Sequence, residues 1–343
     1  MKHDPVRRQL LAGAASLGAL AMMPRIAHAE GSVVSAVYPG SWEEAYRSIV
    51  APALSKAHGV TLEMQPLYAV DQIAKARAAR GNPLFDTFLL DPGPRVTAID
   101  AGLFEKFDPS RLSNASKLQP GMADEHGVTI AAQFVGIAYN PKKFDKPPVG
   151  WADLFAEPYV SRLGLTGFQT TFGTVSILEM SKAFGAKGTD VEPFFAELKK
   201  ALPKIAVIGA PASMPSLFQQ GQCDIMYANT QTVGTLKARG VDIEFVRPAS
   251  GVITFFTTMH IAKGAEQADN AYRYIDTVLS APVQTALMKG PYFMAPVASD
   301  VKLDDTLPLT SLAEMSSMVQ HDWAQINPQR AAWIERFNRE VAR

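Results

Sequence analysis

The sequence is short of the residues that build covalent chemistry. It has 343 residues and one cysteine, Cys223, so no disulfide can form within the chain. Cys223 precedes an apolar, strand-like run, and we expect it to be a small buried side chain. The 33 basic and 33 acidic residues balance. Without a basic excess, nucleic acid is not expected as a partner.

Enzyme signatures are also missing. The chain contains no G-x-S-x-G, no P-loop, no G-x-G-x-x-G after a strand and no H-E-x-x-H. His58, His126, His260 and His321 are scattered without the spacing of metal ligands. We therefore predict no catalytic residue, no metal site and no cofactor. A periplasmic enzyme stays open as an alternative, which turnover of a bound compound would reveal.

A long apolar run is found only near the N-terminus, at residues 10–23, and it is too short to span about 30 Å of hydrocarbon at about 1.5 Å per residue. Basic residues precede it, and Ala27-His28-Ala29 follows it. This pattern predicts a secretory signal peptide, residues 1–29, cleaved after Ala29. We expect a periplasmic protein without a lipid anchor, because no cysteine stands directly after the apolar run. The pair Arg7-Arg8 favours twin-arginine export, with the general secretory route as the alternative.

With 47% hydrophobic and 19% charged residues, the composition is that of a globular protein, and the length favours two domains. Strand and helix patterns alternate over residues 32–101, as in a doubly wound sheet. A second alternation covers residues 163–246. The tail, residues 309–341, has a helical pattern.

Two further strand-like passages lie between these alternating units, at residues 130–139 and 252–261. We predict that the chain crosses between two lobes at both places, so that the lobes can hinge around a cleft. Gly136, inside the first passage, allows a close backbone approach.

Candidate ligand-binding residues lie where strands end, because ligands of open α/β sheets bind outside the carboxyl ends of the strands. Most of them carry hydroxyl, amide or aromatic groups, and several open helices. The set is Tyr38, Ser41, Trp42, Asp91, Phe168, Gln169, Thr170, Thr171, Thr174, Tyr227, Asn229, Thr257 and Tyr292. Any one hydroxyl can instead be a simple helix cap, and about half of the aromatic residues can be core.

Two of these positions carry a specific alternative. Ser41 to Glu44 has the Ser-x-x-Glu form of a capping box, which predicts that Ser41 caps a helix. Asp91 directly follows a buried apolar run, where an unpaired carboxylate is costly. We expect Asp91 either to cap the helix that includes Arg95 or to bind a cationic group of a ligand.

Several motifs resemble one family. Gly136 to Lys143 (GIAYNPKK), Gly150 to Phe155 (GWADLF) and Glu157-Pro158-Tyr159 are similar to segments of the solute-binding components of bacterial ABC importers, in the branch that takes up polyamines, ferric iron, thiamine or 2-aminoethylphosphonate. Weaker matches include Phe85-Asp86 and residues 274–280. The similarity covers nearly all of residues 32–302 and says little about the ligand.

The resemblance implies an α/β protein of the type II periplasmic binding fold, with two doubly wound lobes joined by two crossing strands. It implies lobe 1 at residues 30–134 plus 257–303, and lobe 2 at 135–256 plus 304–343. It further implies a small-molecule solute in the interlobe cleft, and delivery to an ABC permease and ATPase in the inner membrane. We expect a monomer. A ligand-sensing receptor for a sensor kinase is the alternative partner arrangement.

Departures from the family narrow the ligand. Polyamine binders carry acidic residues where this chain has Gly167-Phe168 and Thr257, and ferric binders carry a tyrosine pair near the position of Tyr227. We therefore expect a small polar, anionic or zwitterionic organic solute, with any amine on Asp91. A thiamine-like or polyamine cation is the alternative.

Overall fold

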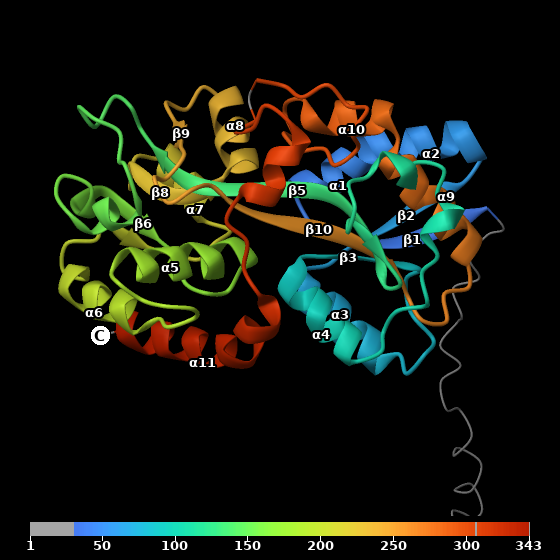
Figure 1. Cartoon of the computed structure of the whole chain (residues 1–343), viewed down its shortest axis with the longest axis horizontal. Helices are drawn as coiled ribbons and strands as arrows, with labels where there is room; N and C mark the ends of the chain where they lie inside the picture. The colour runs from blue at the N-terminus through green and yellow to red at the C-terminus, as the bar shows by residue number, and fades with distance from the viewer. Residues whose placement is uncertain (1–30, 306, 343) are drawn as a thin grey trace, which may run out of the picture. The chain divides into compact units, whose positions relative to one another are not determined.

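A ten-stranded sheet runs through the described part of the chain, residues 31–305 and 307–342 of a computed structural model (Figure 1). Its main path has the order β2-β1-β3-β10-β5-β8-β6-β7, while β4 and β9 pair with β5. The strands are β1 Ser32–Val37, β2 Thr61–Pro66, β3 Thr87–Leu90, β4 Ala123–Asp124, β5 Gly127–Tyr139, β6 Leu163–Leu165, β7 Val207–Ile208, β8 Ile225–Asn229, β9 Glu244–Val246 and β10 Ile253–Ile261. The predicted signal segment and its cleavage site lie outside the described residues.

The two ends of this sheet have the same design. At one end β2, β1 and β3 are parallel, and at the other β8, β6 and β7 are parallel. Between them β10 and β5 run antiparallel to each other and to their outer neighbours. The α/β class and the doubly wound alternation predicted from the sequence are confirmed.

The two predicted crossing strands are adjacent. The first half of β5 pairs with β10 over Val128 to Val135, and its second half pairs with β8 and β9. β10 pairs with β5 over Ile253 to Met259 and with β3 over Thr258 to Ile261. At Gly136 an added Cβ would lie 2.5 Å from the carbonyl oxygen of Val246. The predicted close approach is therefore real, and only glycine fits there. The exact lobe boundaries stay a prediction.

Helices cover both faces of the sheet at each end (Figure 1). Below the strands in that view lie α3 and α4 at one end and α5, α6 and α11 at the other. The helices are α1 Ser41–Ala45, α2 Ala51–His58, α3 Ala69–Ala78, α4 Pro92–Asp100, α5 Thr171–Ala183, α6 Glu192–Ala201, α7 Met214–Gln219, α8 Thr230–Ala238, α9 Ala268–Leu279, α10 Ala281–Met288 and α11 Trp323–Val341. Among the described residues no helix has both the length and the hydropathy to cross a membrane.

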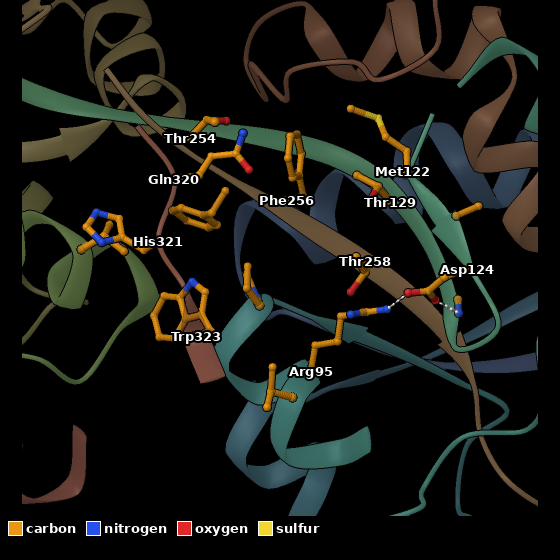
Figure 2. A pocket seen from close by; sticks show the side chains of 17 residues that line it. Arg95, Met122, Asp124, Thr129, Thr254, Phe256, Thr258, Gln320, His321 and Trp323 are labelled. Atoms are coloured by element: carbon orange, nitrogen blue, oxygen red, sulfur yellow. Dashed lines mark hydrogen bonds and ion pairs between the residues drawn. The ribbon is translucent and has the colours of Figure 1, made fainter. Parts of the chain in front are cut away.

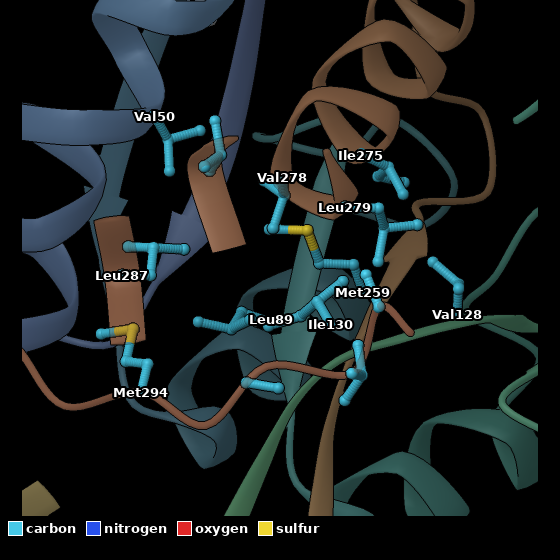
Figure 3. Packing of buried hydrophobic residues seen from close by; sticks show 14 of the residues in the cluster. Val50, Leu89, Val128, Ile130, Met259, Ile275, Val278, Leu279, Leu287 and Met294 are labelled. Atoms are coloured by element: carbon cyan, nitrogen blue, oxygen red, sulfur yellow. The ribbon is translucent and has the colours of Figure 1, made fainter. Parts of the chain in front are cut away.

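Each end has its own hydrophobic core. Figure 3 shows one of them, in which Leu89 of β3 and Met259 of β10 pack beneath Ile275 and Val278 of α9. At the other end, fully buried Phe168 packs against rings of α6 and α11. Full burial of one such side chain stabilises by roughly 1.5–3 kcal/mol. Both cores include residues of the central strands β5 and β10.

Three local predictions meet the structure directly. Cys223 is buried as expected. The tail prediction was too long: α11 starts only at Trp323, after a short 3-10 turn, Leu312–Ser317. The capping box was wrong, since Gly40 is the residue before α1, and Ser41 is the first residue of the helix. Gly40 has φ 82°, a conformation that glycine adopts without strain.

Candidate functional site

Asp91 lies where β3 ends and α4 begins. Its backbone carbonyl accepts the N–H of Arg95 at 2.9 Å, as the residue before a helix does, but its side chain makes no capping bond. The carboxylate Oδ1 instead accepts the hydroxyl of Thr257 at 3.0 Å, with the Gln133 amide at 3.5 Å. Of the two roles foreseen for Asp91, side-chain capping is excluded.

Tyr38, at the end of β1, completes one side of this group. Its hydroxyl accepts the backbone N–H of Asp91 at 2.9 Å, and it lowers the pKa of the Asp91 carboxyl. Burial, followed by the nearby Asp91 charge, raises the pKa of Tyr38 well above its usual range. Tyr38 therefore stays a neutral hydrogen-bonding group at physiological pH.

The Asp91 carboxylate is short of positive charge. Burial raises its pKa from 3.8 to about 6, although hydrogen bonds from Thr257, Thr171 and Tyr38 and the charge of Arg330 act in the opposite direction. Hydroxyl groups satisfy the oxygens but do not neutralise them. A cationic ligand group beside Asp91 would remove this cost.

A chain of side-chain hydrogen bonds joins Asp91 to α8. The Gln133 amide nitrogen donates to Thr257 at 2.9 Å, and the Gln133 oxygen accepts from Asn229 at 3.0 Å. Asn229 is also the N-cap of α8, since its side chain accepts the N–H of Thr232. We call Tyr38, Asp91, Gln133, Thr171, Asn229 and Thr257 the Asp91 cluster. Gln133 was missed from the sequence, although a lone amide inside the apolar run of β5 was a usable signal.

Thr171 brings the opposite end of the sheet to this cluster. It is the first residue of α5 and lies close enough to Asp91 to lower the pKa of that carboxyl. A second contact of this kind joins α8 to α1, because Gln231 donates to the Ser41 hydroxyl at 3.2 Å. Residues from both ends of the sheet therefore approach each other at these two places.

Other predicted residues have structural partners. Thr170 caps α5 by accepting the N–H of Gly173, and Thr174 donates back to the carbonyls of Thr170 and Phe168. Thr170 follows the simple capping alternative, whereas the Thr174 hydroxyl is bonded back to the preceding turn. The Phe168 ring, which we had expected at the cleft, is fully buried because four aromatic side chains surround it.

The remaining predicted residues contact other side chains. Tyr227 is buried, with its hydroxyl on Thr166, and burial raises its pKa. Trp42 is buried against Tyr38, with ring centroids 5.9 Å apart. The Tyr292 hydroxyl bonds Ser48 at 2.8 Å, and Gln169 reaches Asn338.

A cavity of about 250 Å³ is lined by Pro92, the neighbour of Asp91 in sequence, and by Phe255, but by no residue of the Asp91 cluster. Figure 2 shows it between α4, the strands β5 and β10, and the segment that leads into α11. The ion pair of Arg95 with Asp124, 2.5 Å long, lines it, and so do His321 and Trp323. Thr254 also lines this cavity, and among the described residues its buried hydroxyl has no hydrogen-bond partner.

Within residues 31–305 and 307–342, no three His, Cys, Asp or Glu side chains gather as metal ligands would. His260 is packed instead, stacked on Phe104 at 4.1 Å between centroids, and burial lowers its pKa to about 3. The Asp91 carboxylate interacts with its neighbours through hydrogen bonds and charge.

Residues 50–315 match the family described as bacterial extracellular solute-binding protein, and the chain belongs to that family. The spermidine/putrescine-binding periplasmic protein of Escherichia coli is 23% identical over 80% of each chain. The gamma-aminobutyric acid-binding protein of Pseudomonas aeruginosa is 26% identical, over about half of each chain (51% and 52%).

Among solved structures, an ABC transporter substrate-binding protein from Bradyrhizobium japonicum is similar, with a TM-score of 0.75. It is 19% identical, and the match covers 91% of this chain and 100% of that one. At this identity the likeness shows the fold. The two-lobed solute-binding architecture predicted from the sequence is confirmed, and the family and its neighbours are transport binding proteins.

Proposed function

We propose that this protein is the periplasmic binding component of an ABC importer, and that it captures a small polar solute that carries an amine. The single observation that carries the ligand class is Asp91: a carboxylate with a raised pKa, held by the hydroxyl of Thr257 and the amide of Gln133. Such a site gains from an ammonium ion, because the ligand supplies the missing charge.

Binding would be coupled to closure of the lobes. We assign residues 30–134 plus 257–303 to lobe 1 and 135–256 plus 304–343 to lobe 2, because β5 changes its partners near residue 135 and α11 packs into the second core. Asp91 then belongs to lobe 1, and Thr171 and Asn229 belong to lobe 2. A ligand that touches both lobes only in the closed form shifts the population toward that form.

A polyamine is the second candidate, because several relatives bear polyamine names. The local charge argues against it. Of the six residues of the Asp91 cluster, only Asp91 carries a carboxylate, and the charge of Arg330, which we assign to lobe 2, acts on it. A dication would place its second ammonium ion without a matching carboxylate. The gamma-aminobutyric acid-binding relative is chemically closer to this arrangement.

The partner and the cellular location belong to the same proposal. We infer export through the predicted signal, cleavage after Ala29, and delivery of the solute to a permease and ATPase. Intact mass of the protein from a periplasmic extract would give the cleavage site. Permease and ATPase genes beside this gene would support import, and a sensor kinase gene would support the receptor alternative.

The ligand test starts with native mass spectrometry of the purified protein, followed by calorimetry with amino acids, ω-amino acids, amines and diamines. Asp91→Asn should weaken binding of an amine-bearing ligand about tenfold or more, since a charge-assisted hydrogen bond contributes roughly 1.5–3 kcal/mol. The matched control is Asp108→Asn, which removes the same charge from an exposed turn.

Two outcomes would contradict the proposal. Unchanged affinity in Asp91→Asn would reduce Asp91 to a structural role. Scattering curves that show no compaction with a bound ligand would remove the closure mechanism.

A further inference from the structure

Helix α11, which we assign to lobe 2, contacts lobe 1 at its start. Near its start the Asn327 amide donates to the carbonyl of Gly93 at 2.7 Å. The Trp323 ring lies so close to Gly93 that an added Cβ would be 2.6 Å from it. Gly93 is in the first turn of α4, two residues after Asp91. The beginning of α11 is therefore seated on the helix that Asp91 precedes.

Arg330, one turn further along α11, contacts a loop of lobe 2. Its Nε donates to the carbonyl of Phe168 at 3.0 Å and one Nη donates to the carbonyl of Gln169 at 2.8 Å. These bonds fix the guanidinium on the loop that leads into Thr171 and α5. They use two of its five N–H donors.

The charges of Arg330 and Asp91 each shift the pKa of the other side chain. Burial lowers the pKa of Arg330, and the Asp91 charge raises it in return. The guanidinium in turn lowers the pKa of Asp91. In the part of the chain that the structure describes, the two side chains form no direct ion pair. Backbone carbonyls hold the Arg330 guanidinium, whereas the side chain of Thr257 holds the Asp91 carboxylate.

We propose that Arg330 determines specificity by binding the carboxylate of a ligand whose ammonium group lies on Asp91. The protein would then select a zwitterion, such as an ω-amino acid, over a diamine. This rests on the proposed function and names its substrate class. A guanidinium suits a carboxylate because its donors match the two oxygens, whereas a second ammonium ion in that position is repelled. Arg330 carried no sequence signal, since it is one basic residue in an amphipathic helix.

The experiment compares Arg330→Gln with the unmodified protein, by calorimetry with three kinds of probe. The probes are ω-amino acids of two to six carbons, the monoamines of the same lengths and the corresponding diamines. In Arg330→Gln, the affinity for the preferred ω-amino acid should fall about tenfold or more. The affinity for the monoamine should stay within about twofold, and the preference for amino acid over diamine should shrink at least tenfold.

Two further variants separate recognition from folding. Arg336→Gln is the matched control, because Arg336 is on the same helix and pairs with Glu192 at the surface. It should leave all affinities unchanged. Arg330→Lys keeps the charge and should retain part of the amino-acid preference.

The outcomes distinguish the two proposals. Equal losses for all three probes in Arg330→Gln would mean that Arg330 only positions the loop at 168–169, and unchanged affinities would remove it from the site; either result overturns the inference. If the unmodified protein binds no amine-bearing probe at all, the proposed function itself fails, and the inference fails with it.

Discussion

Strand β3 is flanked by two aspartates that differ in the kind of partner they have. Asp86, before the strand, accepts the backbone N–H of Val34 at 2.8 Å and that of Gln267 at 3.1 Å. Asp91, after the strand, accepts from the side chains of Thr257 and Gln133. Backbone donors cannot leave without unfolding, whereas side chains can turn toward a ligand. The same residue type therefore serves the fold at one end of the strand and can serve binding at the other.

The largest effect should come from Asp86→Ala. One buried and one partly buried N–H group would lose their acceptor, and we expect the free energy of unfolding to fall by about 3 kcal/mol. Urea unfolding of the ligand-free protein would measure this. Asp91→Ala is the direct comparison and should leave stability unchanged or slightly raised, because it removes a costly buried charge. Similar losses in both variants would contradict the distinction between the two ends.

An intermediate effect concerns pH. Because folding raises the pKa of Asp91 from 3.8 to about 6, its protonated form contributes stability that is present below about pH 4 and lost as the pH rises through 6. We expect a loss of about 2 kcal/mol from this group in the ligand-free protein. The measurement is the free energy of unfolding from pH 4 to 7, compared with Asp91→Asn, which should lack this component. Parallel curves for the two proteins would show that Asp91 does not titrate in this range.

A smaller effect is expected at Gln133. Gln133→Leu removes hydrogen bonds to Thr257 and Asn229, both of them side-chain groups that can find other partners. The free energy of unfolding should therefore fall by only about 1 kcal/mol. Chemical denaturation would test this, with Asp86→Ala as the reference. A loss as large as that of Asp86→Ala would mean that the Asp91 cluster is as rigid as the core.

Much of the fold could be predicted because its signals are local. The apolar runs of β3, β5, β8 and β10 and the Gly and Asn residues at helix ends made the alternation of strands and helices legible. The errors arose where a local pattern had a competitor. Ser41 has the form of a cap, but Gly40 takes that place because the turn there has a positive φ.

The candidate site was only partly predictable for the same reason. Tyr38, Asp91, Asn229 and Thr257 follow or lie within strands, so the rule on carboxyl ends found them. The rule could not distinguish Phe168, whose ring packs into the core, from the residues that reach the site. Gln133 and Arg330 reach the site through contacts 96 and more than 160 residues apart in sequence, which no local pattern records.

The sequence by itself determined the class of the fold, the two crossing strands around residues 130–139 and 252–261 and the family, because strand periodicity, glycine placement and the Tyr139-Asn140-Pro141 segment are properties of neighbouring residues. The tertiary structure alone decided which polar groups face Asp91 and that Arg330 opposes it. The physical reason is that a carboxylate's role depends on its burial and on the charges and donors around it, and folding brings these from distant parts of the chain.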